Sequence, residues 1–539
     1  MTAIFTNGNA YEVQSAYSDA AAMREIPGGK WSRAEKVWTW PRTPAAALAL
    51  DKALPDAQRD RAFGDDVDEA QVSALMADDA KEGIDLEQPT VAAAPQWAHQ
   101  LRAYHYARAK PAVMLAMGMG TGKTKVTVDL VQNSADRRVL IVCRRKVGVN
   151  VWPAQLRQWL AQPDDWTVDV LTSEGASLSV AKRAARMQAS LAAAGRYIAI
   201  INYEAVANEP MASMLRSVEW DRIILDESQH ISAHNSKRSR FLAQLKATRR
   251  LCLTGTPMHD RPMDVFGQYR FLDPGIYGQS WTRFKFRYAR WGGFGNFKML
   301  GHINVDEFAE RFGSIAIEVG RDVLDLPETQ HITLPVTLNA ATLAAYTAIR
   351  KDFAATLAEG TVSTPNALTR LLRMQQATSG YTTTDDGVDV TLGTDKRDTL
   401  AELLEDLPAD EPVIVFVRFK HDLVAVHEAA AKAGRSSLEV SGARDECARW
   451  QGGEATVLAV QIQSGGEGID LTRAAYCVYY SIGHSLGDYD QSLARVHRPG
   501  QTRPVVYYHL TASATVDVAV YDALDNKRNV IDAVLASLR

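Results

Sequence analysis

A glycine-rich segment, Met-Gly-Met-Gly-Thr-Gly-Lys-Thr, occupies Met117–Thr124 and is the first candidate for chemistry. A glycine-rich backbone can turn several N–H groups toward phosphate oxygens, and Lys123 can add a positive charge at the outer phosphates. The first glycine of the usual G-x-x-x-x-G-K-[ST] pattern is replaced here by Met117. The segment predicts a phosphate-binding loop, and the rest of the chain must indicate which chemistry it serves.

Two adjacent carboxylates follow in Leu-Asp-Glu-Ser-Gln at Leu225–Gln229. Carboxylate and hydroxyl oxygens are ligands that Mg²⁺ prefers, so Asp226 and Thr124 could both bind one Mg²⁺ ion. Glu227 would then remain available to activate a water molecule. The combination of this segment with the glycine-rich loop predicts nucleotide hydrolysis.

Two arginines far along the chain are expected to complete the site. Arg495 and Arg498 are three residues apart, so both would face the same way on a helix. A guanidinium offers a planar set of donors to the charge that develops on a transferred phosphoryl group. Because these arginines are so distant from Lys123 in the chain, two domains must close to complete the site. Hydrolysis would then act as a switch for interdomain motion.

Short apolar runs that alternate with helical stretches are expected to position these residues. The runs are continuously apolar, as in strands covered on both faces, and most end in a polar or glycine-rich turn where ligands bind in parallel sheets. They are Ala112–Ala116, Val139–Cys143, Tyr197–Ile201, Ile223–Leu225 and Leu251–Thr254, and then Val413–Val417, Val457–Val460, Tyr476–Tyr480 and Val505–Leu510. We predict an α/β fold with two parallel-sheet lobes in tandem, with residues 258–400 mostly helical and a small N-terminal α+β domain.

The composition narrows the class of protein. The 539 residues are 46% apolar and 23% charged, as in globular proteins, and no apolar run is long enough to span a bilayer. The N-terminus lacks a secretory signal, and the four cysteines form no C-x-x-C pair. We expect a cytoplasmic protein without membrane association, disulfide framework or zinc ribbon.

The net charge of −4 conceals an uneven distribution. Residues 51–90 contain twelve Asp/Glu against four Lys/Arg, a balance of −8, so the rest of the chain carries +4. We interpret the acidic segment as one or two helices followed by a linker. The mildly basic remainder is compatible with a nucleic-acid partner.

The order of these segments resembles the motor of superfamily-two helicases, over about residues 95–535. Leu253–Met258 (Leu-Thr-Gly-Thr-Pro-Met), Leu371–Gln376 and Gln491–Gln501 further resemble Swi/Snf-type ATPases, which translocate on double-stranded DNA. The resemblance implies two RecA-like lobes, with ATP and Mg²⁺ as cofactors.

The resemblance also implies roles for single residues. Gln100 would recognise adenine, while Lys123 and Thr124 would contact phosphates and Mg²⁺. Asp226 would hold Mg²⁺ and Glu227 would be the general base. The arginine fingers would be Arg495 and Arg498, and the further nucleotide contacts would be Gly120, Thr121, Gly122, Gly468 and Asp470.

Two departures and one further resemblance qualify this picture. Gln229 stands where many relatives have His, and the segment before Gln491 lacks the Trp-Asn-Pro often seen in chromatin remodellers. A nucleosome-directed role is therefore not expected. Ile26–Trp31 and Lys36–Pro41 are similar to the HARP-like module of annealing helicases. Their tryptophans would either stack on bases or form the core of a small domain.

The predicted DNA contacts are Arg144, Arg145, Lys146, Thr256 and Thr472. A second basic set alternates with aromatic residues in Trp281–Trp291 and would either contact phosphates or form a solvated helix face. His99 and His230 are interpreted as incidental neighbours of motif residues.

We expect four regions: a small N-terminal domain at 1–55, an acidic helical linker at 56–94, an ATP-binding lobe at 95–330, and a second lobe at 331–539 with a helical insertion at about 340–400. The predicted function is an ATP-dependent motor, acting as a monomer in a bacterial cytoplasm or nucleoid, that translocates on double-stranded DNA, forked or branched DNA included. The alternatives are a strand-separating helicase and an annealing helicase or nucleotide-gated DNA-binding module that uses the N-terminal region.

Overall fold

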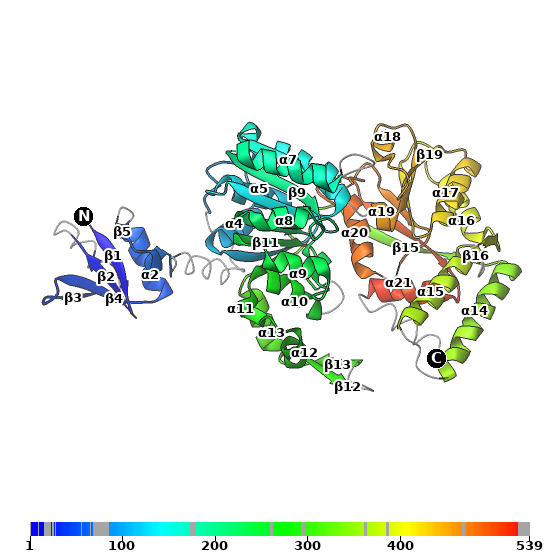
Figure 1. Ribbon diagram of the computed structural model, residues 1–539. Helices are drawn as coiled ribbons and strands as arrows, with labels where there is room; N and C mark the ends of the chain where they lie inside the picture. Colours follow the sequence, from blue (N-terminus) through cyan, green and yellow to red (C-terminus); the bar gives the residue numbers. More distant parts are fainter. Residues whose placement is uncertain are drawn as a thin grey trace.

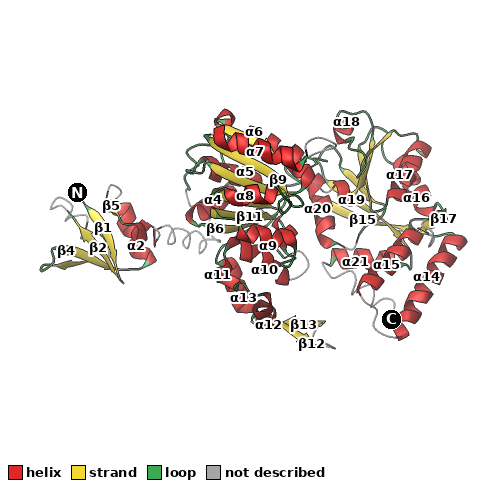
Figure 2. Cartoon of the chain, in the orientation of Figure 1, coloured by secondary structure: helices red, strands yellow, loops and turns green. Residues whose placement is uncertain are grey.

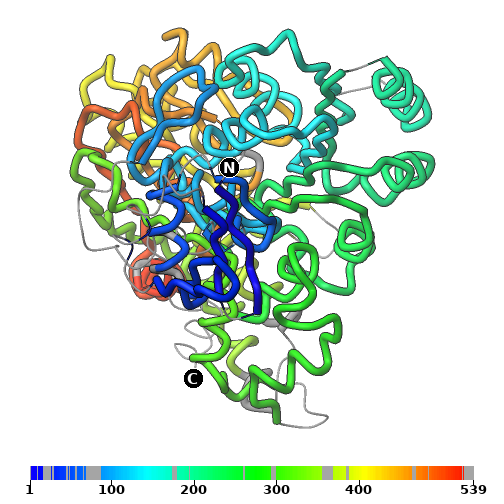
Figure 3. The backbone as a smooth tube through the Cα atoms, turned by 90° about the vertical axis from the view of Figure 1, so that its left-hand side faces the viewer, coloured from blue at the N-terminus to red at the C-terminus, as the bar shows by residue number. Residues whose placement is uncertain are grey.

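A computed structural model gives the fold of the chain. It describes residues 2–8, 10–15, 23, 26, 29–54, 57–64, 66–67, 86–172, 179–193, 195–258, 262–292, 298–359, 364–383, 388–465, 469–483 and 485–526. Three large sheets follow one another along the chain (Figure 1). In the view of Figure 3 the N-terminal strands lie in front of the two larger lobes.

The N-terminal sheet has five strands in the order β3-β4-β2-β1-β5. Helix α2 packs on it and begins after Thr43, whose side chain caps the helix by accepting from Ala46 N. Phe63 and Val67 belong to the same apolar core. The elements are β1 (Ala3–Asn7), β2 (Ala10–Gln14), β3 (Lys30–Ser32), β4 (Val37–Pro41), α2 (Pro44–Ala53) and β5 (Gln58–Arg59). Residues 68–85, which belong to the acidic segment at 51–90, lie outside the described residues.

The first lobe is built on seven parallel strands in the order β14-β6-β11-β10-β7-β9-β8. Its strands are β6 (Ala112–Met117), β7 (Arg138–Cys143), β8 (Trp166–Val170), β9 (Arg196–Asn202), β10 (Trp220–Asp226), β11 (Ala247–Thr254) and β14 (Ala316–Val319). Its helices are α4 (Ala98–Ala109), α5 (Lys123–Gln132), α6 (Trp152–Trp159), α7 (Val180–Ala193), α8 (Met211–Ser217) and α9 (Lys237–Gln244). All five strands expected in this part of the sequence are confirmed.

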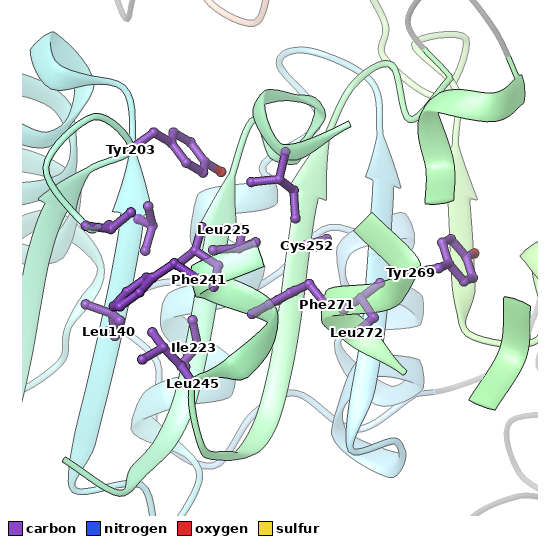
Figure 4. Packing of buried hydrophobic residues seen from close by; sticks show 14 of the residues in the cluster. Leu140, Tyr203, Ile223, Leu225, Phe241, Leu245, Cys252, Tyr269, Phe271 and Leu272 are labelled. Atoms are coloured by element: carbon purple, nitrogen blue, oxygen red, sulfur yellow. The ribbon is translucent and has the colours of Figure 1, made fainter. Parts of the chain in front are cut away.

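Alternation of side chains along these strands produces two separate cores, because successive residues point to opposite faces. In β6, Val113 and Leu115 pack under α4, α5 and α6, whereas Met114 and Ala116 face α7, α8 and α9. Figure 4 shows the second of these cores, where Leu140, Ile223 and Leu225 of the sheet meet Phe241 of α9. Burial of both faces explains why the strands are continuously apolar in sequence.

Helices make up most of the described part of residues 258–400, as expected, and the insertion at about 340–400 is built on the last three of them. This segment contains the helices α10 (Val265–Leu272), α11 (Pro274–Tyr277), α12 (Trp281–Tyr288), α13 (Val305–Gly313), α14 (Ala340–Glu359), α15 (Thr364–Thr378) and α16, which begins at Asp395 and ends at Asp406. It also contains the hairpins β12 (Ala289–Gly292) with β13 (Lys298–His302) and β16 (Tyr381–Thr383) with β17 (Asp389–Thr391). Two further strands, β14 and β15 (Thr329–Val336), each form an edge of a large sheet.

The second lobe has six parallel strands in the order β15-β22-β21-β18-β20-β19. The remaining elements are β18 (Val413–Val417), α17 (Lys420–Lys432), β19 (Ser437–Val440), α18 (Cys447–Gln451), β20 (Val457–Gln461), α19 (Ile462–Gly465), β21 (Tyr476–Tyr479), α20 (Leu486–Val496), β22 (Val505–Ala512) and α21 (Val516–Asp525). Helices cover both faces of its sheet (Figure 2). The two predicted parallel-sheet lobes are therefore confirmed.

The four cysteines are all free and buried. Among the described residues, none of the helices is both long enough and apolar enough to cross a bilayer.

Candidate nucleotide site

The order of the first sheet brings three motifs to one edge. Strands β6, β11 and β10 are neighbours, and all of them are parallel. The glycine-rich loop follows β6, Asp226 ends β10 and Thr254 ends β11. Because the carboxyl ends of parallel strands lie at the same edge, these segments converge although they are distant in sequence.

The glycine-rich loop depends on glycine at two positions. Gly120 and Gly122 have φ angles of +84° and +92°, in the left-handed region that favours glycine. Gly122 is also the residue immediately before α5, and a Cβ there would come within 2.2 Å of Gln100 Nε2. Thr121 Oγ1 donates to Gly118 O at 2.7 Å and closes the turn. The loop therefore leads directly into a helix N-terminus, the geometry that suits phosphate binding.

Lys123 lies inside this loop. Its Nζ donates to Met117 O at 2.7 Å and to Gly118 O at 3.3 Å. Burial lowers the pKa of Lys123, while the charges of Glu227 and Asp226 act in the opposite direction. The ammonium thus lies between the loop carbonyls and two carboxylates, where it could turn toward a bound phosphate. Thr124 follows it in the first turn of α5 and is half-buried.

Gln100 is buried in α4 beside the loop. Its Nε2 donates to Thr121 O at 3.1 Å, and its Oε1 accepts from Trp97 N at 3.1 Å. His99 Nε2 lies 2.8 Å from the same Thr121 carbonyl, so this histidine takes part in holding the loop and is not an incidental neighbour. Recognition of adenine by Gln100 remains a prediction.

Asp226 is held by two aromatic residues that the sequence did not indicate. Trp152, at the start of α6, donates its indole N–H to Asp226 Oδ2 at 2.9 Å. Tyr203 donates its hydroxyl to the backbone oxygen of Asp226 at 2.9 Å. Burial, and then the charge of Glu227, raise the pKa of Asp226 to about 6, although the Trp152 hydrogen bond acts to lower it. No local pattern around Trp152 could have revealed this contact.

Glu227 is connected to the neighbouring strand through Gln229. Glu227 has a φ of +50°, and its Oε2 accepts from Gln229 Nε2 at 2.8 Å. Gln229 Oε1 in turn accepts from Thr254 Oγ1 at 2.9 Å, and Thr256 N donates to Thr254 Oγ1 at 3.0 Å. An amide has both a donor and an acceptor, so Gln229 can bridge a carboxylate and a hydroxyl. The bridge lies within the first lobe.

The two arginines come from the second lobe. Arg495 lies in the last turn of α20, whereas the helix ends at Val496 and Arg498 follows in the next turn. The expectation that both lie on one helix face is therefore wrong, because the chain turns before Arg498. Burial lowers the pKa of Arg495 to about 10, and the positive charges of Arg498 and Arg144 lower it further. The negative charge of Glu227 acts in the opposite direction.

The lobes meet at the glycine-rich loop. A Cβ on Gly120 would lie 3.0 Å from Pro499 Cδ and 3.7 Å from Arg498 Cβ. A cavity of about 340 Å³ lies beside this contact, and the residues around it include Met119, Thr256 and Arg321 from the first part of the chain and Asp490 and Ala494 from α20. In Figure 1, α20 lies at the junction between the lobes.

Comparison with known families decides the identity. Residues 96–379 match the SNF2-related domain, and residues 395–500 match the helicase conserved C-terminal domain. The chain belongs to the SNF2-related family. It is accordingly a helicase-like ATPase and uses a nucleotide.

Individual relatives of this SNF2-related chain vary in length. The putative protein p41 of Acyrthosiphon pisum secondary endosymbiont phage 1 is 25% identical over 452 residues, which cover 78% of this chain and 94% of the phage protein. The DNA annealing helicase and endonuclease ZRANB3 of Homo sapiens is 24% identical over 445 residues, covering 78% of this chain and only 38% of the human protein. The putative ATP-dependent helicase/translocase YwqA of Bacillus subtilis is 24% identical over 347 residues, covering 60% of this chain and 36% of that relative.

A solved structure is also similar to the SNF2-related chain. The Sulfolobus solfataricus SWI2/SNF2 ATPase core in complex with dsDNA has 20% sequence identity and a TM-score of 0.39. The match covers 84% of this chain and 96% of the archaeal one.

Among the described residues, the remaining predicted nucleotide and DNA contacts of the SNF2-related chain do not form one cluster with the glycine-rich loop. Gly468 lies outside the described residues. Asp470 Oδ1 accepts from Thr472 N at 2.9 Å and from Thr472 Oγ1 at 2.7 Å, so these two residues bind each other. Arg144 is half-buried at the end of β7 and acts on Arg495, which places it near the nucleotide site, whereas Arg145 is exposed.

The N-terminal tryptophans and the segment Trp281–Trp291 each combine buried with exposed side chains. Trp40 is fully buried in the N-terminal core, whereas Trp31 is 49% exposed and leans on Trp38 with ring centroids 5.5 Å apart. In α12, Phe284 and Tyr288 are buried, whereas Phe286 is 55% exposed. Arg283, Arg287 and Arg290 are exposed, and Arg287 pairs with Glu307 at 2.8 Å.

Proposed function

We propose that the chain binds ATP with Mg²⁺ between its lobes and uses hydrolysis to translocate on double-stranded DNA, remodelling DNA or protein–DNA complexes. The approach of Pro499 and Arg498 to Gly120 carries this proposal. A nucleotide bound to the loop would contact both lobes at once, so its binding and release would close and open them. Phage and bacterial relatives support a bacterial cytoplasm as the place of action.

The residues at the loop fit a magnesium ion. Thr124 and Asp226 would supply a hydroxyl and a carboxylate oxygen, and Mg²⁺ commonly takes its other ligands from phosphates and water. Burial beside Glu227 raises the pKa of Asp226, so a cation here would relieve the repulsion between the two carboxylates. When bound, the ion would supply positive charge that neutralises the charge developing on the phosphates.

The chain's own groups would then act on the phosphates. Lys123 would leave the carbonyls of Met117 and Gly118 and neutralise the outer phosphates. Glu227, held by Gln229, would accept a proton from the attacking water. Arg495 would stabilise the charge of the transition state, because a guanidinium stays charged even when buried.

DNA would be contacted by Arg145 and Lys146, which follow β7, and by Thr256 and Thr472. The activities in the names of ZRANB3 and YwqA support a DNA partner, although this chain spans less than 40% of either protein. Contact with phosphates through basic side chains would make binding depend on salt and little on sequence.

A comparison of ATP hydrolysis with duplex, forked, single-stranded and no DNA tests the function. We expect duplex DNA to stimulate hydrolysis and the protein to displace the third strand of a triplex. Equal hydrolysis with and without DNA would contradict the motor. Displacement of one strand of a plain duplex would favour a strand-separating helicase instead.

A second function is favoured by the exposed Trp31. Together with Trp38 and the basic Lys30 and Lys36, it would let the N-terminal sheet stack on single-stranded bases and anneal strands. Trp31→Ala is expected to lower annealing while leaving the ATPase rate intact, since this side chain is outside the core. Unchanged annealing would remove this alternative.

We propose a domain division slightly different from the one expected. The N-terminal unit would run to about Val67, because Phe63 and Val67 share its core. The first lobe would start near Gln96 and end after Val319, and the second would begin with β15 at Thr329. Limited proteolysis followed by mass spectrometry tests these limits.

A further inference from the structure

Arg321 lies in the segment that joins the two lobes and packs against the glycine-rich loop. It follows the last residue of β14, Val319, by two positions. Gly118 N donates to Val319 O at 2.8 Å, and a Cβ on Gly118 would come within 2.7 Å of Arg321 Cγ. Only a glycine at position 118 leaves room for the arginine to cross the loop this closely.

The other end of Arg321 binds the second lobe. Its Nη2 donates to the backbone oxygen of His497 and to His497 Nδ1, the latter at 3.2 Å. His497 lies between Arg495 and Arg498 in sequence. One arginine side chain therefore reaches from the loop that would bind phosphate to the peptide that carries both arginines.

His497 is suited to this arrangement as a neutral ring. A guanidinium can only donate, so Nδ1 must accept the hydrogen bond, and Nε2 is left to donate to Pro327 O at 2.7 Å. Burial lowers the pKa of His497, as does the charge of Arg321, while the bond to Pro327 acts in the opposite direction. The imidazole thus attaches to the joining segment at two points, Arg321 and Pro327.

Stability alone does not account for Arg321. Within the described part of the chain, no carboxylate forms an ion pair with it, and its buried Nε has no hydrogen-bond partner. Burial lowers the pKa of Arg321, while the carboxylate of Asp490 acts in the opposite direction. Arg321 is half-buried, and a partly desolvated cation without an ion pair gains little stability, so its place at the junction of two motifs calls for a function.

We propose that Arg321 is a positioning residue that sets the distance between the phosphate-binding loop and the two arginines of the second lobe. The proposal rests on the ATP hydrolysis proposed above. The side-chain contacts that the structure describes for Arg321 are with Gly118 and His497, so Arg321 would fix the His497 peptide relative to Gly118. Transition-state contacts are sensitive to displacements of about 1 Å, so loosening this contact would slow the chemical step more than it weakens nucleotide binding.

The test compares Arg321→Ala with Arg435→Ala. Arg435 is a buried arginine of the second lobe that binds the backbone oxygens of Leu404 and Pro408 at 3.1 and 3.2 Å, and it has no contact with the loop. Arg321→Ala is expected to lower kcat for ATP by about ten- to 100-fold while KM stays within about twofold. Arg435→Ala should lower the unfolding midpoint and leave kcat near that of the wild type.

A second measurement does not depend on hydrolysis. The native cysteines are buried, so dyes can be attached to cysteines introduced at the exposed Ala154 of α6 and Ala431 of α17. With a non-hydrolysable ATP analogue, Arg321→Ala should broaden the distribution of interlobe distances, and His497→Ala should broaden it as well. The double variant should show no more broadening than either single variant, because both substitutions break the same contact.

A kcat for Arg321→Ala within about twofold of the wild type, or an unchanged distance distribution, would overturn the positioning role. A wild-type protein that fails to hydrolyse ATP would instead overturn the proposed function, and the distance measurement would still decide the role of Arg321.

Discussion

Trp152 donates its indole N–H to Asp226 Oδ2 at 2.9 Å, and this contact joins the helix after β7 to the end of β10. Asp226 has a raised pKa of about 6 because it is buried beside Glu227, and Trp152 partly offsets this effect. The indole thus helps to keep charged the carboxylate that we assign to Mg²⁺.

ATP hydrolysis is expected to fall as the pH decreases through about 6, because a protonated Asp226 cannot hold Mg²⁺. Protons and the ion compete for one carboxylate, so higher Mg²⁺ concentrations should shift the midpoint to lower pH. Rate profiles at several Mg²⁺ concentrations check this. A midpoint that ignores Mg²⁺ would contradict the assignment of Asp226.

Deprotonation of Asp226 should raise the rate of hydrolysis but lower the free energy of unfolding. The folded-state pKa of this carboxyl, about 6, exceeds its ordinary value of 3.8, so the folded chain binds more protons between these values. Its contribution to the free energy of unfolding should therefore decline as the pH rises through this window. Denaturant unfolding without Mg²⁺ measures it, and Asp226→Asn should flatten the decline.

Trp152→Phe removes the donor but keeps an aromatic ring in the same space. The pKa of Asp226 should rise, so the midpoint of the rate profile should move to higher pH, while the rate at high pH stays close to that of the wild type. An unshifted midpoint would show that the indole does not influence the carboxylate.

Glu227→Gln should retain ATP binding and lower turnover by about 100- to 10,000-fold, the range for removal of a general base. Binding of a fluorescent ATP analogue and single-turnover hydrolysis separate the two effects. Normal hydrolysis by this variant would refute the assignment of Glu227 as base.

Gln229→Ala breaks the bridge between Glu227 and Thr254. Loss of a hydrogen bond to a charged group costs about 1.5–3 kcal/mol, which corresponds to roughly ten- to 100-fold in kcat if the bond acts in the transition state. Gln229→His, which retains one donor and one acceptor, should restore much of the rate. Equal rates for both variants would mean that the bridge does not orient Glu227.

Gly122→Ala should weaken ATP binding and lower the free energy of unfolding by more than about 1–2 kcal/mol, the cost of a left-handed backbone in an L-residue. The added methyl group also meets Gln100. Gly195→Ala is the matched control, since a Cβ there would have no neighbour within 4 Å. Similar losses in both variants would argue against a special role of Gly122.

Much of the fold could be predicted from the sequence because its signals are local. Strands buried on both faces must be apolar throughout, as β6 and β18 are, and a loop that approaches phosphate needs glycine at Gly120 and Gly122. Strand β15 was missed because it is an edge strand whose residues are mostly exposed or half-buried. It therefore lacks the apolar run that marked its neighbours.

The sequence by itself determined which residue types are available for nucleotide chemistry, namely Lys123, Asp226, Glu227 and the two arginines. Only the tertiary structure decided what holds them. Trp152 meets Asp226 because β7 and β10 are neighbours in the sheet, and Gln229 meets Thr254 because β10 adjoins β11. Arg321 reaches His497 only where the two lobes meet. Such contacts depend on strand order and on the packing of lobes, which residue spacing along the chain does not specify.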